Sequence, residues 1–269
     1  MAFSKEIGKV PEEVVPALYQ SLSAGVPREN VFEFLKTAGE AAIAGVAELK
    51  TSVDGLTSVT NAYGTEVLNV NRASDIMFQT VKLGKTDSTQ LSKSLFNVIP
   101  TASALGVQFE DIGAAIAVMT AQGTPTSVAT TQIRQALVEL NKEGTAASIA
   151  FEELTGKIFK DFIAEGGTLQ EALQMMSEAA DKNNKDISSM FSSYGSSKCW
   201  FSFIWDNASK FKDYLDQMNN SLGATAEAFK KIDDGPARQF EKIKAELSAL
   251  VIELETAFFL LLMKIYFLL

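Results

Sequence analysis

The segment Ala104-Leu-Gly-Val-Gln-Phe-Glu-Asp-Ile-Gly-Ala-Ala-Ile-Ala-Val-Met-Thr-Ala-Gln-Gly123 contains a turn, a helical stripe and a second turn. Ile112, Ile116 and Met119 follow the i, i+4, i+7 spacing that places apolar side chains on one face of an α-helix. A glycine just after a helix end accepts the left-handed conformation that closes the last turn, so Gly106 and Gly123 indicate helix ends. The segment therefore predicts a helix that opens near Glu110, between two short turns.

The same pattern recurs on both sides of this segment. Further stripes at helical spacing are Leu49, Val53 and Leu56; Leu91, Leu95, Val98 and Ala102; and Ile133, Leu137 and Leu140. Polar residues occupy the other faces, so each helix is expected to bury one side. Turn signals predict helix starts near Arg28 and Thr126, and Asp87 with Gln90 fits a capping box. We predict that Leu91, Leu95, Ile112, Ile116, Ile133 and Leu137 are buried.

Strand-like alternation is almost absent, so the predicted fold class is all-α, an array of amphipathic helices joined by short Gly/Pro turns and ending in a longer helix. Three segments are expected: residues 1–144, 145–235 and 236–269. In the second segment we expect a helix over Phe151–Ile163 interrupted at Gly156, a helix over Leu169–Ala180, a polar turn over Asp181–Asp186, and a helix from Ala208 with Phe211, Leu215 and Met218 on one face. The last helix, from about Pro236, is expected to bury a stripe from Phe240 to Leu254 against the core or a second chain.

Composition limits the functional classes. The 269 residues include 24 basic and 33 acidic side chains, a net charge of −9, which argues against a broad nucleic-acid-binding surface. Histidine is absent, which removes the commonest general base and metal ligand. The single Cys199 cannot form an internal disulfide, and the N-terminus lacks the apolar core of a signal peptide, so a reducing compartment is expected.

Motifs that suggest chemistry are incomplete. Leu83-Gly-Lys-Thr86 resembles the end of a phosphate-binding loop, but Gln79 stands where the first glycine is needed, so we expect Gly84 to close a helix and Lys85 to lie in solvent. Asp181, Asn183 and Asp186 do not complete a calcium loop. The remaining candidates are interpreted as solvated charges (Glu152 with Glu153, Asp233 with Asp234), an unactivated thiol (Cys199) and a chance sequon (Asn207-Ala208-Ser209). We therefore predict no catalytic, cofactor-binding or metal-binding residues, no cofactor and no enzyme activity.

Two stretches differ from the helical pattern. Lys198–Trp205 contains both tryptophans and is expected to be poorly integrated into the core. Ala257–Leu269 is apolar on every side of a helix but shorter than the ~20 residues that span a bilayer. We expect this tail to form an exposed patch that drives self-association, and its removal to raise solubility; membrane contact is the alternative.

The order of several motifs resembles the bacteriophage tail tape measure family. The first part of the resemblance contains Ala17-Leu-Tyr-Gln20, Ser23-Ala-Gly-Val-Pro27, Ala44-Gly-Val46 and Leu56-Thr-Ser-Val-Thr-Asn-Ala-Tyr-Gly64. The second contains Phe78-Gln-Thr-Val-Lys-Leu-Gly-Lys-Thr86, Ala104-Leu-Gly-Val107 and Gly123-Thr-Pro-Thr126, and Asp161-Phe162, Gly166-Gly167 with Leu169, and Asp206-Asn207-Ala208 extend it. The resemblance covers about 230 residues.

The resemblance implies a helical structural protein inside a phage tail tube that sets tube length and leaves during DNA ejection. It also implies tail tube and assembly chaperone proteins as partners, self-association through helices, and a place in the virion after assembly in the host cytoplasm. Family members are usually far longer, and neither the Trp200 region nor Phe258–Leu269 fits the family pattern, so a truncated or shifted reading frame in a prophage is expected. The alternatives are a membrane-active helical protein that assists DNA ejection and the remnant of a tail protein bearing a cell-wall hydrolase.

Overall fold

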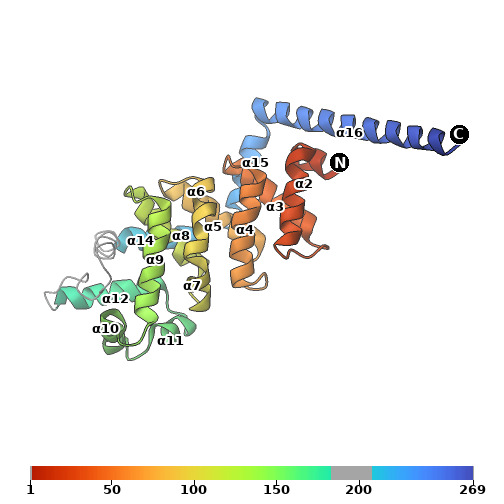
Figure 1. The fold of residues 1–269 in the computed structure, drawn as a ribbon. Helices are drawn as coiled ribbons and strands as arrows, with labels where there is room; N and C mark the ends of the chain where they lie inside the picture. Colours follow the sequence, from red (N-terminus) through yellow and green to blue (C-terminus); the bar gives the residue numbers. More distant parts are fainter. Residues whose placement is uncertain (1, 183–207, 269) are drawn as a thin grey trace. The chain divides into compact units, whose positions relative to one another are not determined.

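The computed structural model describes residues 2–182 and 208–268, and every regular element in these ranges is a helix (Figure 1). The predicted all-α fold class is confirmed. Residue contacts divide the chain into two compact units, unit 1 (Met1–Thr57 with Thr225–Leu269) and unit 2 (Ser58–Ala224). These limits differ from the expected boundaries at residues 144 and 235, because helices far apart in sequence pack on each other. The division into three segments stays a prediction.

Unit 1 is built from helices at both ends of the chain. Its helices are α1 (Ala2–Ile7), α2 (Pro11–Ser23), α3 (Val31–Ala44), the first part of α4 (Leu49–Tyr63), α15 (Ala224–Asp233) and α16 (Pro236–Leu268). Helix α1 packs against α3 and α16, and α2 packs against α3. Leu35, Ala38, Leu49 and Val53 are almost fully buried. The sequence stripe at Leu49, Val53 and Leu56 is thereby confirmed as a core face.

Unit 2 is arranged around α8 (Phe109–Ala121). The other helices are α5 (Val70–Leu83), α6 (Ser88–Ser94), the 3₁₀ turn η1 (Leu95–Asn97), α7 (Ile99–Ala104), α9 (Thr126–Asn141), α10 (Ala146–Thr155), α11 (Phe159–Ala164), α12 (Leu169–Lys182) and α14 (Ala208–Asn219). Helix α8 packs against α5, α7, α9 and α14. The six residues predicted to be buried, Leu91, Leu95, Ile112, Ile116, Ile133 and Leu137, are each no more than 1% exposed.

Helix α8 differs from the expected amphipathic helix. Every residue from Asp111 to Thr120 is buried, so the polar outer face predicted for this helix is absent. The sequence between Gly113 and Met119 is almost wholly small or apolar, and a helix that is apolar all round must be buried on all sides. Its four neighbouring helices provide that cover.

Three turns contain the left-handed glycine that the sequence predicts after a helix end. Gly25, Gly106 and Gly123 have φ angles of 93°, 77° and 97°, the left-handed conformation expected after a helix end. The following helices α8 and α9 begin at Phe109 and Thr126, close to the predicted starts, whereas α3 begins at Val31 rather than near Arg28. A turn precedes α3, in which the Asn30 N–H donates to the Pro27 carbonyl over 3.0 Å.

Gly84 follows the last residue of α5, as predicted, but its φ angle of −91° is not left-handed. A left-handed turn is therefore not the reason for a glycine at this position. A Cβ placed on Gly84 would lie 3.1 Å from the Ala117 Cα and would overlap the Thr120 hydroxyl. Gly84 therefore permits a close approach of α5 to α8. Lys85 is exposed, as predicted.

The stripe from Leu91 to Ala102 is buried but is not one continuous helix. The chain divides into α6, η1 and α7, and Pro100 lies in the first turn of α7. Proline lacks an N–H group and its ring clashes with the carbonyl four residues earlier, so it is tolerated at a helix start but not in a helix interior. At the start of α6, the Gln90 N–H donates to Asp87 Oδ1 over 2.8 Å. The Gln90 side chain bonds the Asp87 carboxylate instead of completing the capping box with the backbone.

The elements after residue 144 largely match expectation. Gly156, with a φ angle of 71°, separates α10 from α11 as predicted. Phe211, Leu215 and Met218 form the buried face of α14. The expected turn at Asp181 is wrong at its start, since α12 continues through Asp181 and Lys182. Asn183–Asp186 and the aromatic stretch Lys198–Trp205 lie outside the described residues.

The last helix begins at Pro236 as predicted, but its large apolar side chains do not pack on the core. Phe240, Ile243, Leu247, Leu250 and Leu254 are 46–71% exposed, and this corrects the expectation that the stripe lies against the core. The buried face instead carries Arg238 together with Ala245 and Ala249, whose small side chains allow α16 to pack closely on α1 and α2. The alternative of burial by a second chain stays a prediction. Phe258–Met263 are 39–63% exposed, which confirms the predicted exposed apolar patch over those residues.

Replacement of Gly113 by Ala is expected to lower the free energy of unfolding by about 1–3 kcal/mol, although Ala is the better helix former. A Cβ at Gly113 would lie 2.8 Å from Thr80 Oγ1 and 2.9 Å from Ile76 Cγ2, both on α5. Gly39, also helical, is the matched control, because its added Cβ would meet nothing closer than 3.5 Å. Urea denaturation of the two variants measures the difference, and equal effects would contradict this account of the α5–α8 contact.

Candidate functional site

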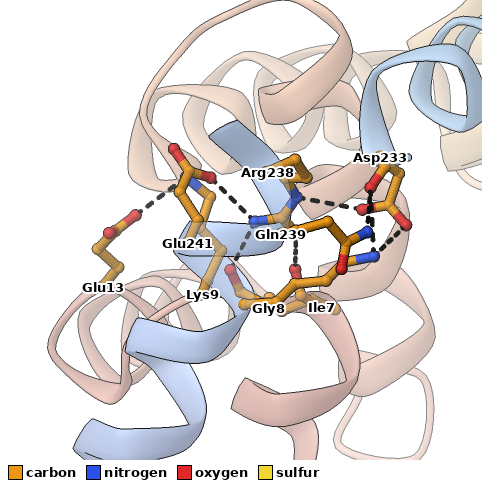
Figure 2. Close-up of polar contacts among 9 residues, drawn as sticks. Ile7, Gly8, Lys9, Glu13, Asp233, Arg238, Gln239 and Glu241 are labelled. Carbon is orange, nitrogen blue, oxygen red and sulfur yellow. Dashed lines mark hydrogen bonds and ion pairs between the residues drawn. The ribbon is translucent and has the colours of Figure 1, made fainter. Parts of the chain in front are cut away.

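The most connected polar cluster in unit 1 surrounds Arg238, in the first turn of α16 (Figure 2). Its Nε donates to Asp233 Oδ1 over 3.1 Å, and its Nη1 donates to the Gly8 carbonyl over 2.6 Å and to Glu241 Oε2 over 3.0 Å. Nη2 donates to the Ile7 carbonyl. The residue is only 4% exposed. The guanidinium thus satisfies carbonyls at the C-terminal end of α1, which have no partner within that helix.

The residues next to Arg238 allow its side chain to lie beside the end of α1. Gly8 has a φ angle of 59°, and a Cβ there would lie 2.7 Å from Arg238 Nη2 and 2.6 Å from Lys242 Cγ. Lys242 donates to Asp233 Oδ2 over 2.6 Å, so Asp233 lies between two cations. The interpretation of Asp233 as a solvated charge is therefore wrong, whereas Asp234 is exposed as predicted. Only glycine leaves room for both long side chains beside the end of α1.

A groove of ≈ 690 Å³ lies next to Arg238 in unit 1. It is lined by Lys9, Glu12, Glu13, Pro16, Ala42, Ile43, Val46, Ala47, Glu48, Leu49, Lys50, Ile232, Ala237, Arg238 and Glu241. Val46 is 90% exposed at this groove and has a φ angle of 51°, an uncommon conformation for a β-branched residue. Lys9 pairs with Glu13 over 3.4 Å, and four of the five Arg238 N–H donors bond protein oxygens. Arg238 thereby fastens α16 to the end of α1.

Unit 2 contains a second polar cluster that fastens the end of α14 to α5. Arg72 bonds Glu110 over 2.8 Å, Ser221 Oγ over 3.0 Å and the Met218 carbonyl over 2.8 Å. Asp75 Oδ2 accepts the Gly223 N–H over 2.7 Å. The contacts to Met218, Ser221 and Gly223 join residues about 150 positions apart in sequence, and no periodic pattern predicts such pairs.

Asp111 is a buried carboxyl group within the apolar helix α8. Its Oδ1 accepts the Gln170 N–H over 3.3 Å, at the start of α12. The pKa of Asp111 is raised from 3.8 to about 7. Burial is the largest cause, the neighbouring Glu110 and Glu171 carboxylates act in the same direction, and bonds from the Gln170 and Leu169 N–H groups oppose it. Sequence reasoning missed this residue; the signal was an acidic side chain inside an otherwise small and apolar run.

Stability is expected to depend on pH through Asp111. Because its folded-state pKa is raised, its contribution is fully present below pH ~4 and is lost as pH rises to about 7. The Asp111→Asn variant keeps an acceptor for the Gln170 N–H but cannot ionise, so its free energy of unfolding should fall less between pH 4 and pH 7. Urea denaturation at a series of pH values measures this difference.

Asp87→Asn is the control of opposite sign. The Gln90 backbone and side-chain hydrogen bonds lower the pKa of Asp87, so its contribution is present above its ordinary pKa and is lost as pH falls. An Asp111→Asn variant with the same pH slope as the parent protein would show that Asp111 is not the titrating group.

The other incomplete motifs of the sequence either lie on the surface or fall outside the described residues. Glu152 and Glu153 are exposed and lie in α10, in agreement with their interpretation as solvated charges. Cys199, Asn183, Asp186 and Asn207 lie outside the described residues. Within residues 2–182 and 208–268, no group of three or more potential metal ligands is present. No helix in the same ranges is long and apolar enough to cross a membrane.

The described residues thus form an all-helical protein, in which the polar clusters join helices that are distant in sequence. The model of the phage-related minor tail protein family matches residues 1–192. The chain therefore belongs to the phage-related minor tail protein family, and the resemblance to tape measure proteins is confirmed. No solved structure matches the chain.

Two curated relatives carry tape measure names. The chain is 31% identical over 264 residues to the probable tape measure protein of Clostridium phage phiCD119, an alignment that covers 94% of this chain and 28% of the relative. It is 21% identical over 250 residues to the tape measure protein of Pneumococcus phage Dp-1, with 90% of this chain and 21% of the relative covered. The chain thus spans about a quarter of the length of these relatives.

Proposed function

We propose that this chain is the core of a tape measure protein that acts in tail assembly and in tail-length determination. The observation that carries the proposal is the 31% identity to the phiCD119 protein over 94% of the chain. The proposed partners are tail tube and assembly chaperone proteins, together with further copies of the chain through helix contacts. The protein would assemble in the host cytoplasm and remain in the tail of the virion, without a cofactor or an enzymatic reaction.

Tail length measured by electron microscopy tests this proposal in the phage that carries the gene. Four extra in-frame copies of the 14-residue segment Phe240–Glu253 would extend α16 by ~84 Å, at 1.5 Å per residue. Tails are expected to lengthen if the extended helix sets their length. An insertion of the same size at the exposed turn residue Gly144 is the control, because a flexible loop adds no fixed length. Assembled tails of unchanged length after the α16 insertion would contradict the length-setting role of this segment.

Exposure of the apolar residues Phe258–Met263 favours the second candidate, a membrane-active protein that assists DNA ejection. Flotation with liposomes, with and without residues 257–269, tests it: tail-dependent flotation supports membrane contact, and its absence argues against it. The hydrolase alternative has a separate test, because a peptidoglycan zymogram detects cell-wall cleavage directly. We expect no clearing in that assay.

A further inference from the structure

One face of α16 carries apolar residues at alternating spacings of three and four. These residues are Phe240, Ile243, Leu247, Leu250, Leu254, Ala257 and Leu261, and we call this set the α16 seam. Every residue of the seam is exposed, and Phe240 and Leu254 reach 71% and 70%. The spacing is that of the a and d positions of a heptad repeat, which face a partner helix in a coiled coil. The seam is thus patterned for another helix.

The seam is not the face that α16 uses in its own unit. Arg238, Ala245 and Ala249 are buried where α16 packs on α1 and α2. At about 100° per residue, this packed face and the seam point in directions roughly 140° apart. The fold of unit 1 therefore uses one side of α16 and leaves the seam uncovered. Figure 1 shows α16 as a single long helix, so the seam is a continuous surface.

The area of the seam is sufficient for a stable contact. The six large seam residues, with the adjacent exposed Val251 and Phe258, form a stripe of eight apolar side chains. Burial of one such side chain removes ~60–120 Å² from water, so the stripe would bury roughly 500–1,000 Å² per chain. A specific protein–protein interface buries about 800 Å² per partner.

The flanking charges indicate the orientation of the pair. Glu246 and Glu253 lie at the g positions of the repeat, and Lys244 lies at an e position. In a parallel pair, g residues face the e residues of the next heptad, so Glu246 meets Val251 and Glu253 meets Phe258 of the other copy. In an antiparallel pair, g faces g, and the registers with the largest overlap bring Glu253 next to Glu246 or to its own copy. Lys5 pairs with Glu253 over 3.1 Å, but an exposed pair of this kind offsets little of that repulsion.

We infer that the α16 seam is a self-association surface, on which a second copy of this chain packs in parallel and in register. This inference rests on the self-association part of the proposed function and adds its surface and orientation. It differs from association through the apolar tail, because five seam residues, Phe240 to Leu254, precede Ala257.

Disulfide crosslinking of the full chain tests the orientation. In a Cys199→Ala background, the single variants Phe240→Cys and Leu254→Cys are each expected to crosslink to their own copy. The rate should exceed that of the exposed control Leu222→Cys by at least about tenfold, because a held pair has an effective concentration near millimolar. In an antiparallel pair, neither variant crosslinks alone, and bonds form only between different seam positions, such as Phe240→Cys mixed with Ala257→Cys or Leu254→Cys mixed with Leu250→Cys. That pattern would overturn the inference.

Sedimentation tests the surface itself. Leu247→Glu is expected to convert the associated protein to a monomer, whereas Leu222→Glu, an equally apolar and 81% exposed site outside the seam, should leave the mass unchanged. Deletion of residues 257–269 should retain the Phe240→Cys crosslink. Association that survives Leu247→Glu and disappears with the deletion would overturn the seam but leave the proposed self-association standing. A parent protein that is monomeric would overturn both, without bearing on tail-length measurements in the phage.

Discussion

Replacement of Arg238 by Ala is expected to lower the free energy of unfolding of unit 1 by about 3–5 kcal/mol. The substitution removes one of the two cations beside Asp233, and it leaves the Ile7 and Gly8 carbonyls without the donors that now reach them. Buried carbonyls that lose a charged donor keep their desolvation penalty, which is why the loss exceeds that of an exposed ion pair. Urea denaturation measures the change, and hydrogen exchange at α1 and α16 locates it.

Two variants separate this cause from a general effect of arginine removal. Arg134→Ala changes an exposed arginine of unit 2 and should shift stability by less than about 0.5 kcal/mol. Asp233→Asn combined with Arg238→Ala should cost less than the sum of the two single variants, because either one alone already breaks the Asp233–Arg238 bond. A loss below about 1 kcal/mol for Arg238→Ala, or fully additive losses in the double variant, would contradict a structural role for the cluster.

The Arg238 cluster also shows why sequence patterns missed part of the site. Arg238 and the two carbonyls that it bonds are about 230 positions apart, so no local spacing connects them. Asp233 was noticed only as a neighbour of Asp234 and was interpreted as solvated. A pairwise contact between distant segments depends on tertiary packing, which periodicity does not encode. Asp111 was missed for a related reason, since its raised pKa arises mainly from burial, which depends on tertiary packing.

Patterns that depend on neighbours three or four positions away were predicted well. The apolar stripes identified core faces at Leu56, Ile133 and Phe211, and the glycines after helix ends identified turns. The spacing of apolar residues did not predict which surface packs on a stripe. The stripe from Phe240 to Leu254 has regular helical spacing, yet its own unit buries Ala245 and Ala249 on another face of the helix. An apolar stripe therefore predicts that one face of a helix is buried. Which helix or chain buries that face depends on the other surfaces available.

Leu95 combines a correct burial prediction with a wrong local structure. The spacing Leu91, Leu95, Val98 predicts one helix, but Leu95 lies in the 3₁₀ turn η1 between α6 and α7. It is 0% exposed all the same, and η1 packs against α9. Pro100 changes the path of the backbone without moving the apolar side chains away from the core. The burial of Leu95 was therefore predictable from the apolar spacing, whereas the break between α6 and α7 was predictable only from Pro100.

Replacement of Leu95 by Ala is expected to lower the free energy of unfolding of unit 2 by about 2–5 kcal/mol, the sum of lost apolar transfer and the cavity left behind. The upper part of this range applies if α6, η1 and α9 cannot collapse onto the space. Leu222→Ala is the matched control, since its side chain is 81% exposed and its removal creates no cavity. Urea denaturation of both variants compares them. A Leu95→Ala loss no larger than that of Leu222→Ala would mean that the 3₁₀ turn is free to repack, and that η1 does not anchor α6 and α7 to α9.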